Sequence, residues 1–119
     1  GKIVICDRFV DSSLAYQGYA RGLGIEEVYK INQFAIDNHL PDKTLFLNVD
    51  AKTGLDRISN RANKDRLDQE ELSFHNAVFE GYQKVIEMFK DRMIIIDATK
   101  SEVEVVDMCY QEVIKIIND

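Results

Sequence analysis

Three apolar runs divide this chain and predict three buried strands. They are Ile3-Val4-Ile5, Leu45-Phe46-Leu47 with Val49, and Met93-Ile94-Ile95-Ile96. None of them alternates polar with apolar positions, which is typical of strands covered on both faces, as in a parallel sheet beneath helices. The pattern therefore predicts an α/β fold in which helices flank a parallel sheet.

Helical periodicity fills the segments between and after these runs. Gly22 and Gly24 can adopt the left-handed conformation that ends a helix, and Ser101 with Glu104 has the spacing of a capping box. Apolar stripes are expected to face the core, namely Val28, Ile31 and Ala35 in one helix and Val103, Val106, Tyr110, Val113, Ile114 and Ile117 in the last. The expected helices cover about Ser13 to Ala20, Glu26 to Asn38, Ala51 to Asn60, Gln69 to Lys90 and Ser101 to Asn118.

Composition and charge narrow the class of protein. A chain of 119 residues with 45% hydrophobic content is enough for one domain with a sizeable core. Its net charge of -6 argues against duplex nucleic acid or an anionic membrane as a partner. No apolar run approaches the roughly 20 residues that span a bilayer. Cys6 and Cys109 have no metal-like spacing and are expected to be buried free thiols of a reducing compartment.

Polar chemistry gathers directly after the first apolar run, in Cys6-Asp7-Arg8-Phe9-Val10-Asp11-Ser12-Ser13-Leu14-Ala15-Tyr16-Gln17-Gly18. In open α/β sheets, ligands bind where strands end. Arg8 offers paired donors to phosphate oxygens. Asp7 can accept from a sugar hydroxyl or hold a magnesium-bound water. Gln17 carries both a donor and an acceptor, so it can recognise the edge of a base.

Simpler structural roles stay open for the same residues. Asp11, Ser12 or Ser13 can cap the following helix by accepting from its free amides, and for Ser12 capping is favoured over ligand contact. Asp7 and Arg8 can also form an ion pair with each other. An exposed pair of this kind contributes little to stability.

The residues as written closely resemble the thymidylate kinase family in its bacterial form. The resemblance is carried, in order, by Asp7-Arg8-Phe9, by Ser12-Ser13-Leu14-Ala15-Tyr16-Gln17-Gly18, by Arg66-Leu67-Asp68-Gln69-Glu70 and by Gly81-Tyr82-Gln83. It covers essentially the whole chain but begins partway into the family's chain. It implies a three-layer fold of the P-loop kinase type. It also implies a cytoplasmic homodimer that uses Mg2+ and transfers the γ-phosphoryl group of ATP to deoxythymidine monophosphate (dTMP), giving the diphosphate.

The resemblance also implies a role for each residue near the first run. Arg8 would orient the acceptor phosphate, and Asp7 would meet the sugar or the magnesium shell. Ser13 and Gln17 would contact the thymine edge, with Tyr16 beside the deoxyribose.

Residues 57–68 resemble the lid that folds over the phosphate donor in this family. Arg61 would be the catalytic arginine of the lid and Arg57 would lie against the adenine of ATP, whereas Arg66 and Asp68 would anchor the end of the lid. From the residues alone, this polar stretch can equally be a solvated charged surface. Beside a phosphate-binding Arg8, its arginines suit the negative charge that spreads over a phosphoryl group in transfer.

The sequence departs from the family pattern in one large respect. A kinase of this superfamily needs G-x-x-x-x-G-K-[ST] to hold the donor phosphates, and these residues contain no such run. The family also takes a thymine-stacking phenylalanine and a second base-contacting arginine from the segment before this one. We therefore expect residues 1–119 to be the carboxyl-terminal portion of the domain, with the central strand and the phosphate loop in an amino-terminal segment that completes the fold.

Two other interpretations remain. A related nucleoside or nucleoside-monophosphate kinase would share Asp7-Arg8 and a lid, but not the pairing of Tyr16 with Gln17. A non-catalytic truncated domain that binds a nucleotide or a partner would account for the missing loop. The presence of Asp7-Arg8 and of the lid arginines argues against a long-decayed relic and favours a fragment of a working gene product.

Residues 1–119 by themselves are expected to transfer no phosphoryl group, because the cradle for the donor phosphates is not among them. They are also expected to lack a cooperative thermal transition, because strands without their central neighbour leave backbone groups unpaired. A coupled assay with ATP and dTMP and a thermal melt of the isolated segment check both points. Turnover would contradict the first expectation, and a monomeric, cooperatively melting segment would contradict the second.

Overall fold

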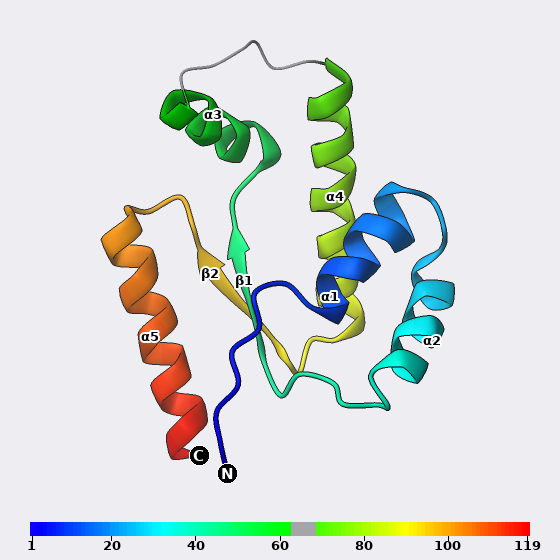
Figure 1. Cartoon of the computed structure of the whole chain (residues 1–119). Coiled ribbons are helices and arrows are strands. Elements are labelled where there is room, and N and C mark those ends of the chain that lie inside the picture. Colours follow the sequence, from blue (N-terminus) through cyan, green and yellow to red (C-terminus); the bar gives the residue numbers. More distant parts are fainter. Residues whose placement is uncertain (63–68) are drawn as a thin grey trace.

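The computed structural model describes the backbone of residues 1–62 and 69–119 and the side chains of residues 1–58 and 71–119. Helices lie on both sides of a pair of strands, with α5 on one side and α1, α2 and α4 on the other (Figure 1). The chain is therefore a mixed α/β structure, as the sequence pattern predicts. The elements in order are α1 (Val10–Ser13), η1 (Leu14–Ala20), α2 (Ile25–Ala35), β1 (Thr44–Asn48), α3 (Ala51–Ala62), α4 (Gln69–Met88), β2 (Met93–Asp97) and α5 (Glu102–Asn118).

The two strands form a parallel pair, in register from Thr44 opposite Met93 to Asn48 opposite Asp97. They coincide with the second and third apolar runs and confirm both predicted strands. The chain crosses from one strand to the other through α3 and α4, the type of connection that parallel strands require. Both strands end at the same edge of the sheet, which is the edge where α/β proteins bind ligands.

The predicted strand at Ile3-Val4-Ile5 is wrong. Residues 1–6 form neither helix nor strand, and the three apolar side chains are 65%, 85% and 83% exposed. A strand exists only when a neighbour pairs with its backbone, and in the described part of the chain no strand lies beside this segment. Within residues 1–62 and 69–119 the sheet accordingly has two strands rather than three, and Cys6 is exposed rather than buried.

Other apolar faces predicted to be covered are also open. Leu47 and Ile95 in the strands are 49% and 53% exposed. On α5, Val103 and Val106 are 79% and 61% exposed, and on α2 Ile31 is 68% exposed. A stripe of apolar residues shows which face of an element needs cover, but not where the covering atoms come from. The first turn of α5 matches its prediction, since Ser101 and Glu104 form the capping box.

The core lies between the helices on one side of the sheet and the sheet itself. Val10, Leu14 and Val85 are almost completely buried, at 1%, 0% and 0% exposure. Val28, Phe46 and Met93 complete this buried cluster. The core thus holds α1, η1, α2 and α4 against the strands and fixes the segment that carries the predicted site.

The helix after residue 9 differs from its prediction in start and type. It begins at Val10 as a short α-helix and continues from Leu14 as a π-helix, so that the Arg21 amide donates to the Tyr16 carbonyl five residues earlier, at 2.9 Å. π-helices are rare and are frequent at functional sites. Gly22, with φ of 79°, lies in the predicted left-handed region after it, whereas Gly24, with φ of 98° and ψ of 126°, is the N-cap residue of α2.

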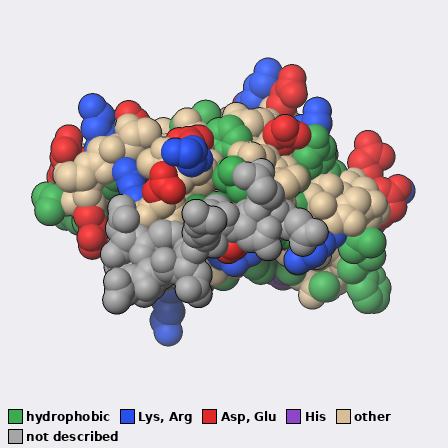
Figure 2. All heavy atoms as spheres, turned by 90° about the horizontal axis from the view of Figure 1, so that it is seen from above, with side chains coloured by type: hydrophobic (Ala, Val, Ile, Leu, Met, Phe, Trp, Pro, Cys, Tyr) green, Lys and Arg blue, Asp and Glu red, His purple; other side chains and the backbone are tan. Residues whose placement is uncertain are grey.

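The surface seen from above mixes charges of both signs (Figure 2). Acidic and basic side chains alternate there, with hydrophobic side chains between them. Among the helices that the structure describes, none is long and apolar enough to cross a membrane.

The π-helix η1 packs closely on α4 at Gly81. A Cβ atom at this position would lie 2.9 Å from the Ala15 carbonyl oxygen and 3.0 Å from Tyr19 Cβ. Contacts this short with backbone cannot relax without moving a helix. Gly81 therefore sets the distance between the predicted base-binding helix and α4.

Gly81→Ala should lower the free energy of unfolding of the protein by about 1–3 kcal/mol, because the added methyl group overpacks this helix contact. Gly54→Ala in α3 is the matched control. The nearest atom to its Cβ would be Val49 Cγ1 at 3.8 Å, so this change should be neutral or stabilise by up to about 1 kcal/mol. Chemical denaturation of the two variants measures both effects, and equal stabilities would refute the role of Gly81.

Candidate functional site

The backbone bends sharply where the candidate site begins. Arg8 has φ of 63°, in the left-handed region that residues other than glycine seldom adopt. Such strained residues cluster at binding and active sites, where the surrounding structure holds them. The bend lies directly before α1, so it carries the chain from the exposed residues 1–6 onto the core.

The Arg8 guanidinium is held by two neighbours. Its Nε donates to Ser12 Oγ at 2.9 Å, and its central carbon lies 4.3 Å from the centre of the Tyr16 ring. Arg8 itself is exposed, and in the described part of the chain its terminal nitrogens make no hydrogen bond. These terminal nitrogens are the fork that binds phosphate or carboxylate oxygens. The arrangement can thus grip an oxyanion with a guanidinium whose position is already fixed.

An aromatic wall formed by Tyr16, Phe74 and Tyr82 lies beside this guanidinium. The centre of the Tyr16 ring is 6.1 Å from that of Phe74 and 6.3 Å from that of Tyr82. A second guanidinium, that of Arg21, lies 4.2 Å from the centre of Phe74. Rings of this kind can pack against a planar base or sugar. Phe74, Tyr82 and Arg21 were not among the predicted site residues.

Burial raises the pKa of the Tyr82 phenol above its ordinary value of 10.0, and a hydrogen bond with Ser12 opposes the rise. Tyr82 is therefore a protonated, neutral donor at neutral pH. Its ring also packs against Phe46 of β1, with centres 4.9 Å apart. The wall is consequently joined to the sheet as well as to η1.

Asp11 and Ser12 do not cap the helix as predicted. The helix begins after Phe9 without a side-chain cap. Asp11 is 4% exposed and accepts from Arg92 Nη2 at 2.5 Å and from Thr44 Oγ1 at 2.7 Å. The Asp11 carboxylate therefore accepts from Arg92 and Thr44 rather than from the helix amides. The Ser12 hydroxyl likewise accepts from Arg8. The ion pair between Asp7 and Arg8 that the sequence left open as an alternative is not formed among the described residues.

The remaining predicted residues of this segment lie around the same turn. Ser13 is half-buried, and Asp7 and Gln17 are exposed. Within the described residues neither Asp7 nor Gln17 forms a side-chain hydrogen bond. The structure therefore brings Arg8 and Tyr16 into contact and leaves Asp7 and Gln17 accessible to a ligand.

Arg57 belongs to α3, and its guanidinium lies away from Arg8, at the carboxyl end of β2. Its guanidinium donates to the carbonyl oxygens of Ala98 at 2.6 Å and Thr99 at 3.3 Å. In the same loop, hydrogen bonds from Thr99 lower the pKa of the Asp97 carboxyl below its ordinary value of 3.8. This loop follows the edge where the strands end, so Arg57 helps to shape a second part of that edge.

The predicted lid lies mostly outside the described residues. The backbone of Arg61 belongs to α3 rather than to a loop, and nothing is described of its side chain. Lys64, Arg66 and Asp68 lie outside the described residues. Among the residues that the structure does describe, no group of three or more His, Cys, Asp or Glu side chains could hold a metal ion.

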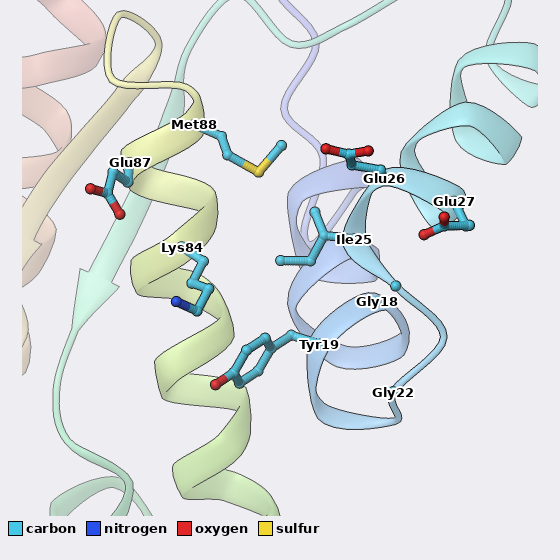
Figure 3. A pocket seen from close by; sticks show the side chains of 10 residues that line it. Gly18, Tyr19, Gly22, Ile25, Glu26, Glu27, Lys84, Glu87 and Met88 are labelled. Carbon is cyan, nitrogen blue, oxygen red and sulfur yellow. The ribbon is translucent and has the colours of Figure 1, made fainter.

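A pocket of about 590 Å³ lies elsewhere, between the glycine turn after η1 and α4 (Figure 3). Ile25 and Met88 extend toward each other across it, with Tyr19 and Lys84 beside them. It contains none of the predicted site residues. The strained turn at Arg8 and the aromatic wall, rather than this pocket, form the candidate site.

Known proteins match nearly the whole chain. The family model described as thymidylate kinase matches residues 1–109. A thymidylate kinase of Geobacillus sp. (strain WCH70) is 58% identical over 110 residues, covering 91% of this chain and 52% of that protein. Those of Oceanobacillus iheyensis and Bacillus velezensis are 55% and 51% identical, covering 96% and 100% of this chain but 51% and 55% of their own lengths. The chain spans about half the length of the curated relatives it matches.

Tyr82→Phe should remove the part of the alkaline destabilisation that comes from this buried phenol. Because the unfolded chain releases the phenol proton near 10.0 and the folded chain only at higher pH, this group makes the free energy of unfolding fall as pH rises past 10.0. Tyrosinate absorbance against pH, with the free energy of unfolding at each pH, measures the effect.

Tyr19 provides the comparison, since its hydrogen bond to Glu80 at 2.9 Å raises the pKa of its exposed phenol. Glu80→Gln should lower that pKa and leave the Tyr82 transition in place. If the transition lost in Tyr82→Phe lay at or below 10.0, the described burial of this phenol would be wrong.

Proposed function

This chain belongs to the thymidylate kinase family, and on that basis we propose that it forms the carboxyl-terminal half of an enzyme that transfers the γ-phosphoryl group of ATP to dTMP. The names of its relatives and the half of their length that it covers support this proposal. The substrates of the whole enzyme are part of the proposal.

The geometry of Arg8 carries the proposal. A guanidinium fixed by Ser12 and Tyr16, with its terminal nitrogens free among the described residues, suits a phosphate that must be oriented for in-line transfer. Arg8 thus binds the phosphate of dTMP. Asp7, exposed directly before it, accepts from the sugar or from a water of the magnesium shell.

The base and sugar of the acceptor are assigned to the following helix. Gln17, exposed on η1, offers a donor and an acceptor to the thymine edge, and Ser13 contributes a hydroxyl. Tyr16 packs beside the deoxyribose, with Phe74 and Tyr82 extending the same wall. Such hydrogen-bonding pairs discriminate between bases more strongly than apolar contact does.

The donor is assigned to the other part of the strand edge. Arg57 lies at the loop after β2, where its aliphatic stem and guanidinium can pack against the adenine of ATP. Arg61 is the catalytic arginine that stabilises the phosphoryl group in transfer. Magnesium bound with ATP would supply neutralisation of the charge on the donor phosphates, and Asp7 could accept from a water of its shell.

The rest of the polypeptide supplies the donor-phosphate loop and completes the sheet. The open edges of the strand pair, the exposed Ile3-Val4-Ile5 and the uncovered apolar face of α5 support this part of the proposal. A strand between residues 3–5 and β1 would pair the backbone of both and bury these side chains. A homodimer, which the family resemblance implies, belongs to the same proposal.

The full-length protein should therefore phosphorylate dTMP in preference to other deoxynucleoside monophosphates, in a coupled assay with ATP and Mg2+. Gln17→Leu should lower kcat/KM for dTMP by about 3- to 10-fold, the value of one lost hydrogen bond, without changing the melting temperature, because Gln17 is exposed.

Gln111→Leu is the matched control. Gln111 is exposed on α5, far along the chain from the site, and its replacement should leave kcat/KM unchanged. Equal rates with all monophosphates would favour a related kinase with a different acceptor. The absence of any transfer by the full-length protein would favour a non-catalytic domain.

A further inference from the structure

The buried carboxylate of Asp11 joins three elements that are distant in sequence. Asp11 lies in α1, its partner Thr44 begins β1, and its partner Arg92 lies between α4 and β2. Arg92 is in turn stacked on Phe89, 3.8 Å from the ring centre, and its carbonyl accepts from the Thr44 amide at 2.9 Å. Asp11 thereby fixes α1 to the frame of the sheet at a single point.

This point lies one residue from the oxygen that holds Arg8. Ser12 Oγ accepts from Arg8 Nε at 2.9 Å, and the amides of Ser12 and Ser13 both donate to the Phe9 carbonyl, at 3.1 Å and 3.2 Å. These bonds form a tight turn that connects Asp11 to the left-handed Arg8. A strained residue persists only where its surroundings hold it firmly. Among the described residues, the turn is anchored by the ion pair of Asp11, by the apolar burial of Val10 and Leu14, and by the contacts of Ser12 and Arg8 with tyrosine side chains.

We propose that Asp11 is a positioning residue: paired with Arg92 and Thr44, it holds Ser12 so that the Arg8 guanidinium is aimed at the acceptor phosphate. Asp11 is buried and both of its oxygens already accept from Thr44 and Arg92, so it acts through its neighbours. This inference rests on the proposed function, since it assumes that Arg8 binds the phosphate of dTMP. Apolar burial alone could hold α1 against the sheet, so the contacts of Asp11 with Arg92 and Thr44 are assigned the further role of orienting Arg8.

Comparing the binding of dTMP with that of thymidine, which lacks the phosphate, isolates the contribution of Arg8 to phosphate binding. In the full-length protein, the ratio of the two dissociation constants measures what the phosphate adds to binding. Asp11→Asn keeps the size of the side chain and removes its charge. It should reduce the ratio by about tenfold, the effect of a disturbed charge-assisted contact. Thymidine binding should change by less than about twofold, because Gln17, the residue proposed to hydrogen-bond the thymine edge, lies in η1, six residues beyond Asp11.

A double-mutant cycle shows whether Asp11 acts through Arg8. Arg8→Ala alone should reduce the ratio, and adding Asp11→Asn to Arg8→Ala should reduce it no further. Glu112→Gln, which removes the α5 ion pair with Lys115 at 3.3 Å, is the control and should leave the ratio unchanged. Equal weakening of dTMP and thymidine by Asp11→Asn would overturn the inference, as would independent effects of Asp11→Asn and Arg8→Ala.

Ser12→Ala tests the same connection if Asp11→Asn fails to fold. It breaks the bond from Arg8 and leaves the ion pair of Asp11 in place. It should reduce the ratio while the melting temperature stays within a few degrees of the parent protein, and an unchanged ratio would overturn the inference. A parent protein that bound thymidine and dTMP equally, or neither, would instead contradict the proposed function.

Discussion

A carboxylate removed from water needs a charge or hydrogen-bond donors beside it, and the packing of this protein follows from how Asp11 meets that need. Its two oxygens are taken by the Arg92 guanidinium and the Thr44 hydroxyl. Leaving one member of such a buried pair alone typically costs about 3–5 kcal/mol. The requirement therefore keeps α1, the start of β1 and the turn before β2 together. The exposed side chains of α1 and η1 are thus positioned relative to the contact of Asp11 with Arg92 and Thr44.

The elements that could be predicted are those whose signal is local. The apolar runs at β1 and β2, the long periodic stripe of α4 and the capping box at Ser101 each need only neighbouring residues, and all four are observed. The run Ile3-Val4-Ile5 has the same composition but forms no strand, because its backbone has no partner among the described residues. The apolar stripe of α5 is exposed for a related reason, because no described element covers Val103 and Val106. An apolar pattern shows which face of an element is stable only when buried, and whether that face is buried depends on other segments.

The candidate site was predictable in its centre and not in its supports. Arg8, Ser13, Tyr16 and Gln17 stand close together in the sequence, so their motif was visible. Arg92, which is 81 residues from Asp11, and Phe74 and Tyr82, which build the aromatic wall from α4, carry no local signal of their role. From the sequence, Asp11 is one of three residues that can cap the helix, because short polar residues are favoured at that position. Only the fold shows that burial directs it elsewhere.

The π-helical form of η1 has a consequence for how this segment can change in evolution. Its carbonyls bond to amides five residues on, so one residue fewer would return Leu14–Ala20 to α-helical winding. Every side chain after the deletion would then turn by about 100° around the helix axis. A deletion before Gln17 would turn both Gln17 and Gly18, which packs against the Ile25 backbone, away from their present directions. Substitutions should therefore accumulate here more readily than insertions or deletions, and the number of residues in this segment should be preserved even where their identity drifts.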